Sequence, residues 1–205
     1  MNGWFLILEG NKIVSDNINP IYLSFHITNE KKLDSKAINN FRKYEPIGCR
    51  DLFTYNVLKN LNIKSYFSAC LTLTLDIDFA AKDSERTNGI IFVDYSLGEI
   101  PQVDNSLYSL KDYNFKNIIK LTHYFRMNQP HIERFRKAKY LLDRYARAKL
   151  VVTSRLHAAF HCLALKTPVI SVKKNNFNQN LISGLYKFLN TVGYDDQGKF
   201  EITIN

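Results

Sequence analysis

The fold is decided by the stretch Leu150-Val151-Val152-Thr153-Ser154-Arg155-Leu156-His157-Ala158-Ala159-Phe160-His161-Cys162-Leu163-Ala164-Leu165-Lys166-Thr167-Pro168-Val169-Ile170-Ser171-Val172. It holds a short apolar run, a helix-compatible segment and, after a Thr-Pro turn, a second β-branched run. This order predicts a strand, a helix and a strand, with both strands buried. We expect Ser154 to cap the helix, which leaves Arg155 and His157 in its first turn. Because a helix N-terminus already favours negative charge, these side chains predict a site for a phosphate or a carboxylate.

The same alternation of strands and helices extends along the chain. A polar run over 82–89 is the best candidate for a linker, and it divides the chain into an N-terminal part, 1–82, and a C-terminal part, 83–205. Alternating strands and helices predict an α/β protein with parallel sheets, whose ligands bind at the carboxyl ends of strands. Strands are predicted at 4–8, 21–27, near 65, 90–93 and 118–121, and helices around 38–41 and over 51–61, 107–113, 130–149 and 180–192.

A second loop between a strand and a helix carries Gly48-Cys49-Arg50-Asp51. Gly48 allows a sharp turn, and Asp51 is a natural cap for the helix that follows. Arg50 is then left at the mouth of that helix, the position that Arg155 takes in the first stretch. Arg50 also has a structural alternative, because it could pair with Asp51 or cap a neighbouring carbonyl.

Polar side chains follow other predicted strands as well. His26 ends an apolar strand, and His123 lies directly after the strand that ends at Leu121. Both positions suit a structural role as well as they suit contact with a ligand. Lys173 and Lys174 follow the strand that ends at Val172, where they could line the same anion site or form a solvated pair.

Composition is ordinary for a soluble globular protein, with 45% hydrophobic and 23% charged residues among 205. The net charge of +9 favours anionic partners. Much of the excess lies over 134–149, where apolar residues follow helical spacing, so we interpret these charges as the solvated face of a helix and expect no nucleic-acid partner. No apolar run is long enough to span a bilayer, and the start lacks the features of a secretory signal, so a cytoplasmic location is expected. Cys49, Cys70 and Cys162 suit neither disulfides nor a metal site.

Several motifs together resemble the polysaccharide pyruvyl transferase family. The segment 48–51 followed by Thr54 resembles the family's Gly-x-Arg-Asp motif, and 153–159 with 164–170 resembles its C-terminal signature. Residues 68–73 and 2–4 are also similar to the family pattern, so the resemblance runs in order from about residue 2 to residue 190. It implies two Rossmann-like parts with parallel sheets, as in GT-B glycosyltransferases. The first part is expected to be incomplete, since family members usually begin with a strand, a Gly-rich turn and a helix that precede this sequence.

The resemblance also implies an activity. Family members transfer the enolpyruvyl carbons of phosphoenolpyruvate to a saccharide hydroxyl as a ketal, in polysaccharide or exopolysaccharide biosynthesis. A saccharide or a lipid-linked oligosaccharide is then the expected acceptor, with no cofactor and no metal. We expect His157 to act as general acid and Arg155 to bind the donor, because imidazole and guanidinium suit these tasks. The remaining assignments are donor binding for Arg50, Ser154 and Lys173, and the acceptor side or cleft for Asp51, His26 and His123.

Other functions compete with this one. Asp76-Ile77-Asp78 has the spacing with which glycosyltransferases hold a divalent ion against a diphosphate, which would make the chain a nucleotide-sugar-dependent glycosyltransferase. His157 and His161 are four residues apart and could bind zinc, but no third ligand with suitable spacing is evident. A third alternative is an inactive relative that keeps affinity for anions or glycans.

Overall fold

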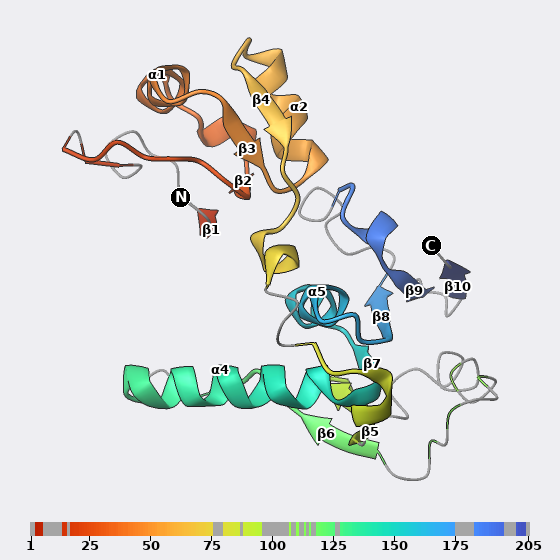
Figure 1. The fold of residues 1–205 in the computed structure, drawn as a ribbon. Coiled ribbons are helices and arrows are strands. Elements are labelled where there is room, and N and C mark those ends of the chain that lie inside the picture. The colour runs from red at the N-terminus through yellow and green to blue at the C-terminus, as the bar shows by residue number, and fades with distance from the viewer. Residues whose placement is uncertain are drawn as a thin grey trace. The chain divides into compact units, whose positions relative to one another are not determined.

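The computed structural model describes residues 3–5, 14–15, 17–75, 80–86, 88–95, 107, 110, 113, 115, 118–125, 128–174, 183–194 and 200–203 (Figure 1). The chain divides into two compact units. Unit 1 contains Met1–Leu71 and Asn178–Tyr186, and unit 2 contains Thr72–Phe177 and Lys187–Asn205. This division differs from the predicted parts, 1–82 and 83–205, in two ways: residues 72–82 belong to unit 2, and residues 178–186 belong to unit 1. Each unit carries its own sheet, so the predicted α/β class with two Rossmann-like parts is confirmed.

Unit 1 is a parallel sheet with strand order β1-β2-β3-β4, accompanied by two capped helices. Asp34 and Asp51 each accept a backbone N–H of the first helical turn at 2.8 Å, which confirms the predicted cap at Asp51. The sheet core contains three aromatic rings, Tyr22, Phe25 and Phe41, in edge-to-face contact. The elements are β1 (Gly3–Phe5), β2 (Phe25–Ile27), α1 (Ser35–Lys43), β3 (Ile47–Cys49), α2 (Leu52–Asn60) and β4 (Ser65–Phe67).

Unit 2 is a six-stranded sheet with the order β10-β9-β8-β7-β5-β6, parallel except for β10 at the edge. The central strands are buried on both faces: Ile90, Ile91, Phe92 and Val93 of β5 are at most 3% exposed. The described residues contain no helix that is both long enough and apolar enough to cross a membrane. The elements are β5 (Asn88–Val93), β6 (Ile118–Leu121), α4 (His131–Ala146), β7 (Ala148–Thr153), α5 (Leu156–Ala164), β8 (Val169–Lys174), β9 (Asn190–Tyr194) and β10 (Phe200–Thr203), with short 3-10 turns at Glu30–Lys32, Leu71–Thr74, Asp83–Glu85 and Tyr186–Phe188.

Some predicted elements differ from those observed. The strand–helix–strand unit at 150–172 is confirmed, but the helix predicted over 180–192 is wrong where the chain is described, since 190–194 forms β9 and pairs with β8. The strand predicted at 21–27 is reduced to β2, because Ser24 has a left-handed backbone with φ 54°. The helix predicted over 130–149 ends at Ala146, and β7 begins two residues later, at Ala148. Most of the helix predicted over 107–113 and part of the strand predicted at 4–8 lie outside the described residues.

The predicted linker over 82–89 is anchored at Arg86. The residue Arg86 is only 8% exposed. Its guanidinium donates to the carbonyls of Ala146 and Lys166 and to the Thr167 hydroxyl, each at 2.8 Å. Three strong acceptors therefore bind one buried cation. The segment before β5 is part of the packed unit rather than a loose connection.

Replacing Arg86 by Ala should lower the free energy of unfolding by about 2 to 4 kcal/mol, because the buried Ala146 carbonyl and Thr167 hydroxyl and the partly buried Lys166 carbonyl lose their donor. The matched control is Arg136→Ala, which removes an exposed arginine paired with Glu133 and should cost less than about 1 kcal/mol. Urea unfolding of both variants measures the difference. Equal and small losses in the two variants would show that the Arg86 contacts do not stabilise the fold.

Candidate functional site

The polar residues of unit 2 gather where its parallel strands end. Asp94 follows β5, Thr122 and His123 follow β6, and Arg155 follows β7 after one intervening residue. The chain passes from β5 to β6 on one side, and then returns through α4 to β7 on the other side of β5. The loops after β5 and β7 therefore leave these neighbouring strands in opposite directions. In open α/β sheets, ligands bind in the crevice between two such loops.

Asp94 is the centre of this arrangement. Its Oδ1 accepts a hydrogen bond from the Thr122 hydroxyl at 2.5 Å, and its Oδ2 accepts from the His123 backbone N–H at 3.2 Å and from Arg155 Nε at 3.0 Å. Burial alone would raise the pKa of Asp94, but these hydrogen bonds and the charge of Arg155 outweigh it and lower the pKa. Sequence reasoning missed Asp94, although an aspartate directly after a buried strand was an available signal.

Arg155 and Ser154 are held differently from the prediction. Arg155 is the N-cap residue of α5, and its backbone N–H donates to the Thr153 hydroxyl at 2.9 Å. The Ser154 hydroxyl donates to the Asp94 carbonyl at 2.7 Å, so the prediction that it caps the helix is wrong. The Arg155 side chain is 52% exposed and uses Nε for Asp94. Its two terminal nitrogens have no partner among the described residues, which leaves them available to an anion.

Three histidines belong to the same region of unit 2. His157 is exposed in the first turn of α5. His123 and His161 are partly buried. Burial lowers the pKa of His123, helped by the charge of Arg155 and opposed by that of Asp94. Burial, with His123 and His157 nearby, lowers the pKa of His161 to about 4. At neutral pH His123 and His161 are therefore uncharged. The described residues hold no cluster with the composition of a metal site, and Asp76-Ile77-Asp78 lies outside them.

Lys173 lies near the end of β8, the strand next to β7, and its side chain is half-buried. It therefore belongs to the same edge of the sheet as Arg155. Lys174 closes β8, and its side chain lies outside the described residues.

Unit 1 carries a separate buried cluster at the ends of β2 and β3. His26 Nδ1 lies 2.6 Å from Asp51 Oδ2, while Asp51 Oδ1 accepts the Thr54 N–H that caps α2. Arg50 Nε is 3.7 Å from the same Oδ2, so the alternative pairing of Arg50 with Asp51 is present as an ion pair. His26 and Asp51 are fully buried, and Arg50 is 8% exposed. Burial lowers the pKa of Arg50, and the Asp51 charge opposes that shift.

Gly48 serves close approach rather than a sharp turn. It lies within β3, and a Cβ placed there would be 3.0 Å from the Tyr66 hydroxyl and 3.2 Å from the Leu23 side chain. A side chain at this position would force its neighbours apart. The structure thus brings together two groups of predicted site residues. Unit 1 holds His26, Arg50 and Asp51, and one edge of the unit 2 sheet holds His123, Ser154, Arg155, His157 and Lys173.

These features define an α/β protein of the Rossmann-like class, with polar and cationic residues at the carboxyl ends of its parallel strands. A family model described as polysaccharide pyruvyl transferase matches residues 8–175. The chain therefore belongs to the polysaccharide pyruvyl transferase family. Comparison with curated proteins and with solved structures gives no significant match. The matched range includes the site residues of both units, from His26 to Lys173.

The lowered pKa of Asp94 makes its contribution to stability dependent on pH. A carboxylate with a lowered pKa stabilises the folded state above its unfolded pKa of about 3.9, and the contribution fades as the pH falls through the folded pKa. We therefore expect Asp94→Asn to be less stable than the wild type at about pH 6, with the gap shrinking towards about pH 3. Chemical denaturation at both pH values measures the gap. A gap of constant size would mean that the Asp94 charge does not stabilise the fold.

Proposed function

We propose that this chain transfers the pyruvyl group of phosphoenolpyruvate to a saccharide, forming a ketal and releasing phosphate. Membership of the family supports transfer of a pyruvyl group in general. The observation that carries the proposal for the donor is the exposed start of α5, where Arg155 keeps its terminal nitrogens available and His157 follows two residues later. A guanidinium and the free N–H groups of a helix N-terminus together suit a small ligand with two acidic groups.

The chemistry assigns one task to each side chain. His157 donates a proton to the methylene carbon of phosphoenolpyruvate, and a sugar hydroxyl adds to the adjacent carbon. The bond from that carbon to the phosphate oxygen then breaks, and a second hydroxyl of the sugar completes the ketal. Of the two hydroxyl protons released, one replaces the proton given by His157 and the other leaves with the phosphate. Arg155 holds the donor's anionic groups during these steps.

The other residues take supporting roles in the proposal. Asp94 fixes the Arg155 guanidinium through Nε, and Ser154 ties the same loop to the Asp94 carbonyl. Lys173 adds positive charge at the same sheet edge. In unit 1 we assign a substrate contact to Arg50 alone, with the fully buried His26 and Asp51 holding it in place. The reaction has no diphosphate to bridge, so we propose neither a metal nor a cofactor.

Replacing His157 by Ala should slow phosphate release from phosphoenolpyruvate in the presence of an acceptor saccharide by about 10²- to 10⁴-fold, because the general acid is lost. The fold should be unaffected, since this side chain is exposed. The matched control is His131→Ala, an exposed histidine in the first turn of α4. A phosphate-release assay, with the ketal confirmed by mass spectrometry, measures both variants. Equal rates in the wild type and His157→Ala would remove His157 from the mechanism, and cleavage of a nucleotide sugar instead would favour a glycosyltransferase.

Replacing Arg155 by Lys should weaken phosphoenolpyruvate binding by about tenfold, because lysine keeps the charge but loses the planar fork. Arg147→Lys, at an exposed position just after α4, is the control and should bind as the wild type does. Calorimetric titration with phosphoenolpyruvate compares the two. An unchanged affinity in Arg155→Lys would place the donor elsewhere.

A further inference from the structure

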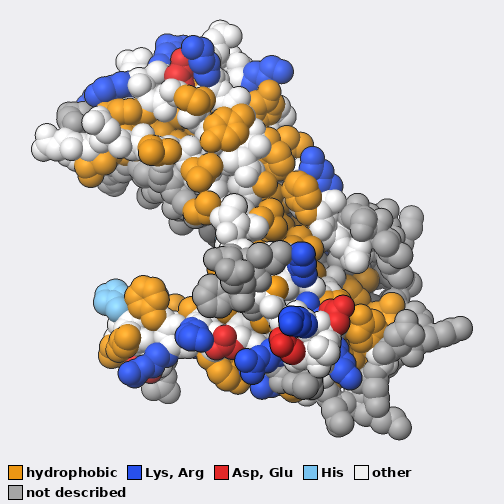
Figure 2. Space-filling model, viewed as in Figure 1, with side chains coloured by type: hydrophobic (Ala, Val, Ile, Leu, Met, Phe, Trp, Pro, Cys, Tyr) orange, Lys and Arg blue, Asp and Glu red, His pale blue; other side chains and the backbone are white. Residues whose placement is uncertain are grey.

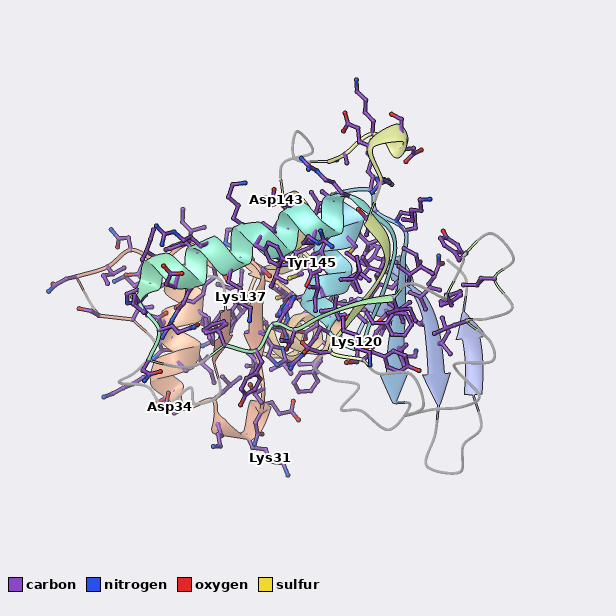
Figure 3. All side chains as sticks on the ribbon, turned by 90° about the horizontal axis from the view of Figure 1, so that it is seen from below. Lys31, Asp34, Lys120, Lys137, Asp143 and Tyr145 are labelled. Atoms are coloured by element: carbon purple, nitrogen blue, oxygen red, sulfur yellow. The ribbon has the colours of Figure 1, made fainter. Side chains whose placement is uncertain are left out.

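A pocket of about 200 Å³ opens on unit 2 beside the site at Asp94. It is enclosed by the loop after β6, by α4 and by His161 of α5. Its α4 residues recur at helical spacing, from Arg134 to Tyr145, so they share one face of the helix. Figure 3 shows Lys137 and Tyr145 on one side of α4 and Asp143 on the other. His123 joins pocket and site, because its backbone N–H binds Asp94 while its side chain lines the pocket.

The interior of the pocket is uncharged. Ala138, Leu141 and Leu142 supply carbon surface, and His123 binds the Tyr145 hydroxyl through Nε2 at 2.5 Å. The lowered pKa values of His123 and His161 keep both imidazoles neutral at physiological pH. A charged group would lose its hydration here with little in return, whereas an apolar group fits such a lining.

The mouth of the pocket is positive. Arg134 and Lys137 lie over the Phe125 ring, with their cationic groups 5.4 and 6.0 Å from its centroid. Backbone carbonyls orient both: Arg134 Nε donates to Gln129, and Lys137 Nζ donates to Tyr124. None of the described residues that line the pocket is acidic.

Outside the pocket, two other cations of α4 are paired with acidic residues of the same helix. There Arg136 pairs with Glu133 at 2.5 Å and Lys139 with Asp143 at 2.9 Å. Figure 2 shows basic and hydrophobic side chains next to each other along this helix. Arg134 and Lys137 are half-buried rather than on the solvated face that the sequence predicted for them.

We propose that this pocket binds a small amphipathic anion, with an apolar ring or short chain against Leu141 and Leu142 and a phosphate or carboxylate between Arg134 and Lys137. The pocket is smaller than the roughly 300 to 1,000 Å³ typical of drug-sized ligands, so a single ring or a short chain fills it. Phosphoenolpyruvate, with two acidic groups and almost no apolar surface, does not match this lining. Binding in this pocket does not require pyruvyl transfer, so this proposal is independent of the proposed reaction.

Calorimetric titration of the full chain with octyl phosphate tests this binding, with inorganic phosphate and octanol as partial ligands. We expect octyl phosphate to bind at least about tenfold more tightly than either, because only it uses both the mouth and the interior. Ala138→Phe fills the pocket from an exposed helix position, and Leu142→Phe fills it from within; Lys137→Ala removes a cation. Each should weaken octyl phosphate binding about tenfold.

The matched control is Lys139→Ala, which removes a lysine two residues away that pairs with Asp143. It should bind octyl phosphate as the wild type does. Sedimentation with vesicles that contain phosphatidic acid shows whether the ligand is a lipid or a free molecule. Vesicle binding that Ala138→Phe abolishes identifies a lipid. Octyl phosphate binding without vesicle binding identifies a free molecule. Binding no tighter than that of inorganic phosphate, unchanged in Ala138→Phe, or lost equally in Lys139→Ala, would overturn the proposal.

Discussion

The site of unit 2 depends on one carboxylate at the end of β5. Asp94 binds the loop after β6 through Thr122 and His123, and the loop after β7 through Arg155. Its backbone is left-handed, with φ 49°, a conformation that aspartate tolerates better than most residues and that turns the chain sharply at the strand end. The paired carboxylate reduces the positive charge of Arg155 but fixes its direction. Because only Nε is engaged, the guanidinium can still receive an anion through its terminal nitrogens.

Both units use an aspartate to tie neighbouring strand ends together, yet the results differ in accessibility. In unit 1, Asp51 binds His26 from β2 and caps α2, and the cluster is almost fully buried. In unit 2, Arg155 is half exposed and His157 is exposed. A closed cluster of this kind holds its charges in place with internal partners, whereas an open one keeps capacity for a ligand. This contrast is why the donor chemistry is assigned to unit 2.

Local patterns predicted the elements whose causes are local. The apolar runs at 90–93, 118–121 and 150–153 became strands, and Asp51 caps α2, because neighbouring residues alone decide these features. The failures involve partners far along the chain. Ser154 was expected to cap its own helix, but its hydroxyl binds a carbonyl 60 residues away. The helix predicted over 180–192 overlaps the start of β9, which pairing with β8 stabilises as a strand. The position of Asp94 directly after a buried strand is visible in the sequence, but its bond to Arg155 depends on the pairing of β5 with β7.

The positive charge of the chain also has a meaning that composition hides. A net charge of +9 by itself suggests any anionic partner. On α4 the exposed Arg136 and Lys139 pair with acidic residues of the same helix. Arg134 and Lys137 instead lie over an aromatic ring at the mouth of an apolar pocket, where we propose that they attract an anion. The role proposed for this helix therefore depends on where these two cations lie, and not on how many cations the helix carries.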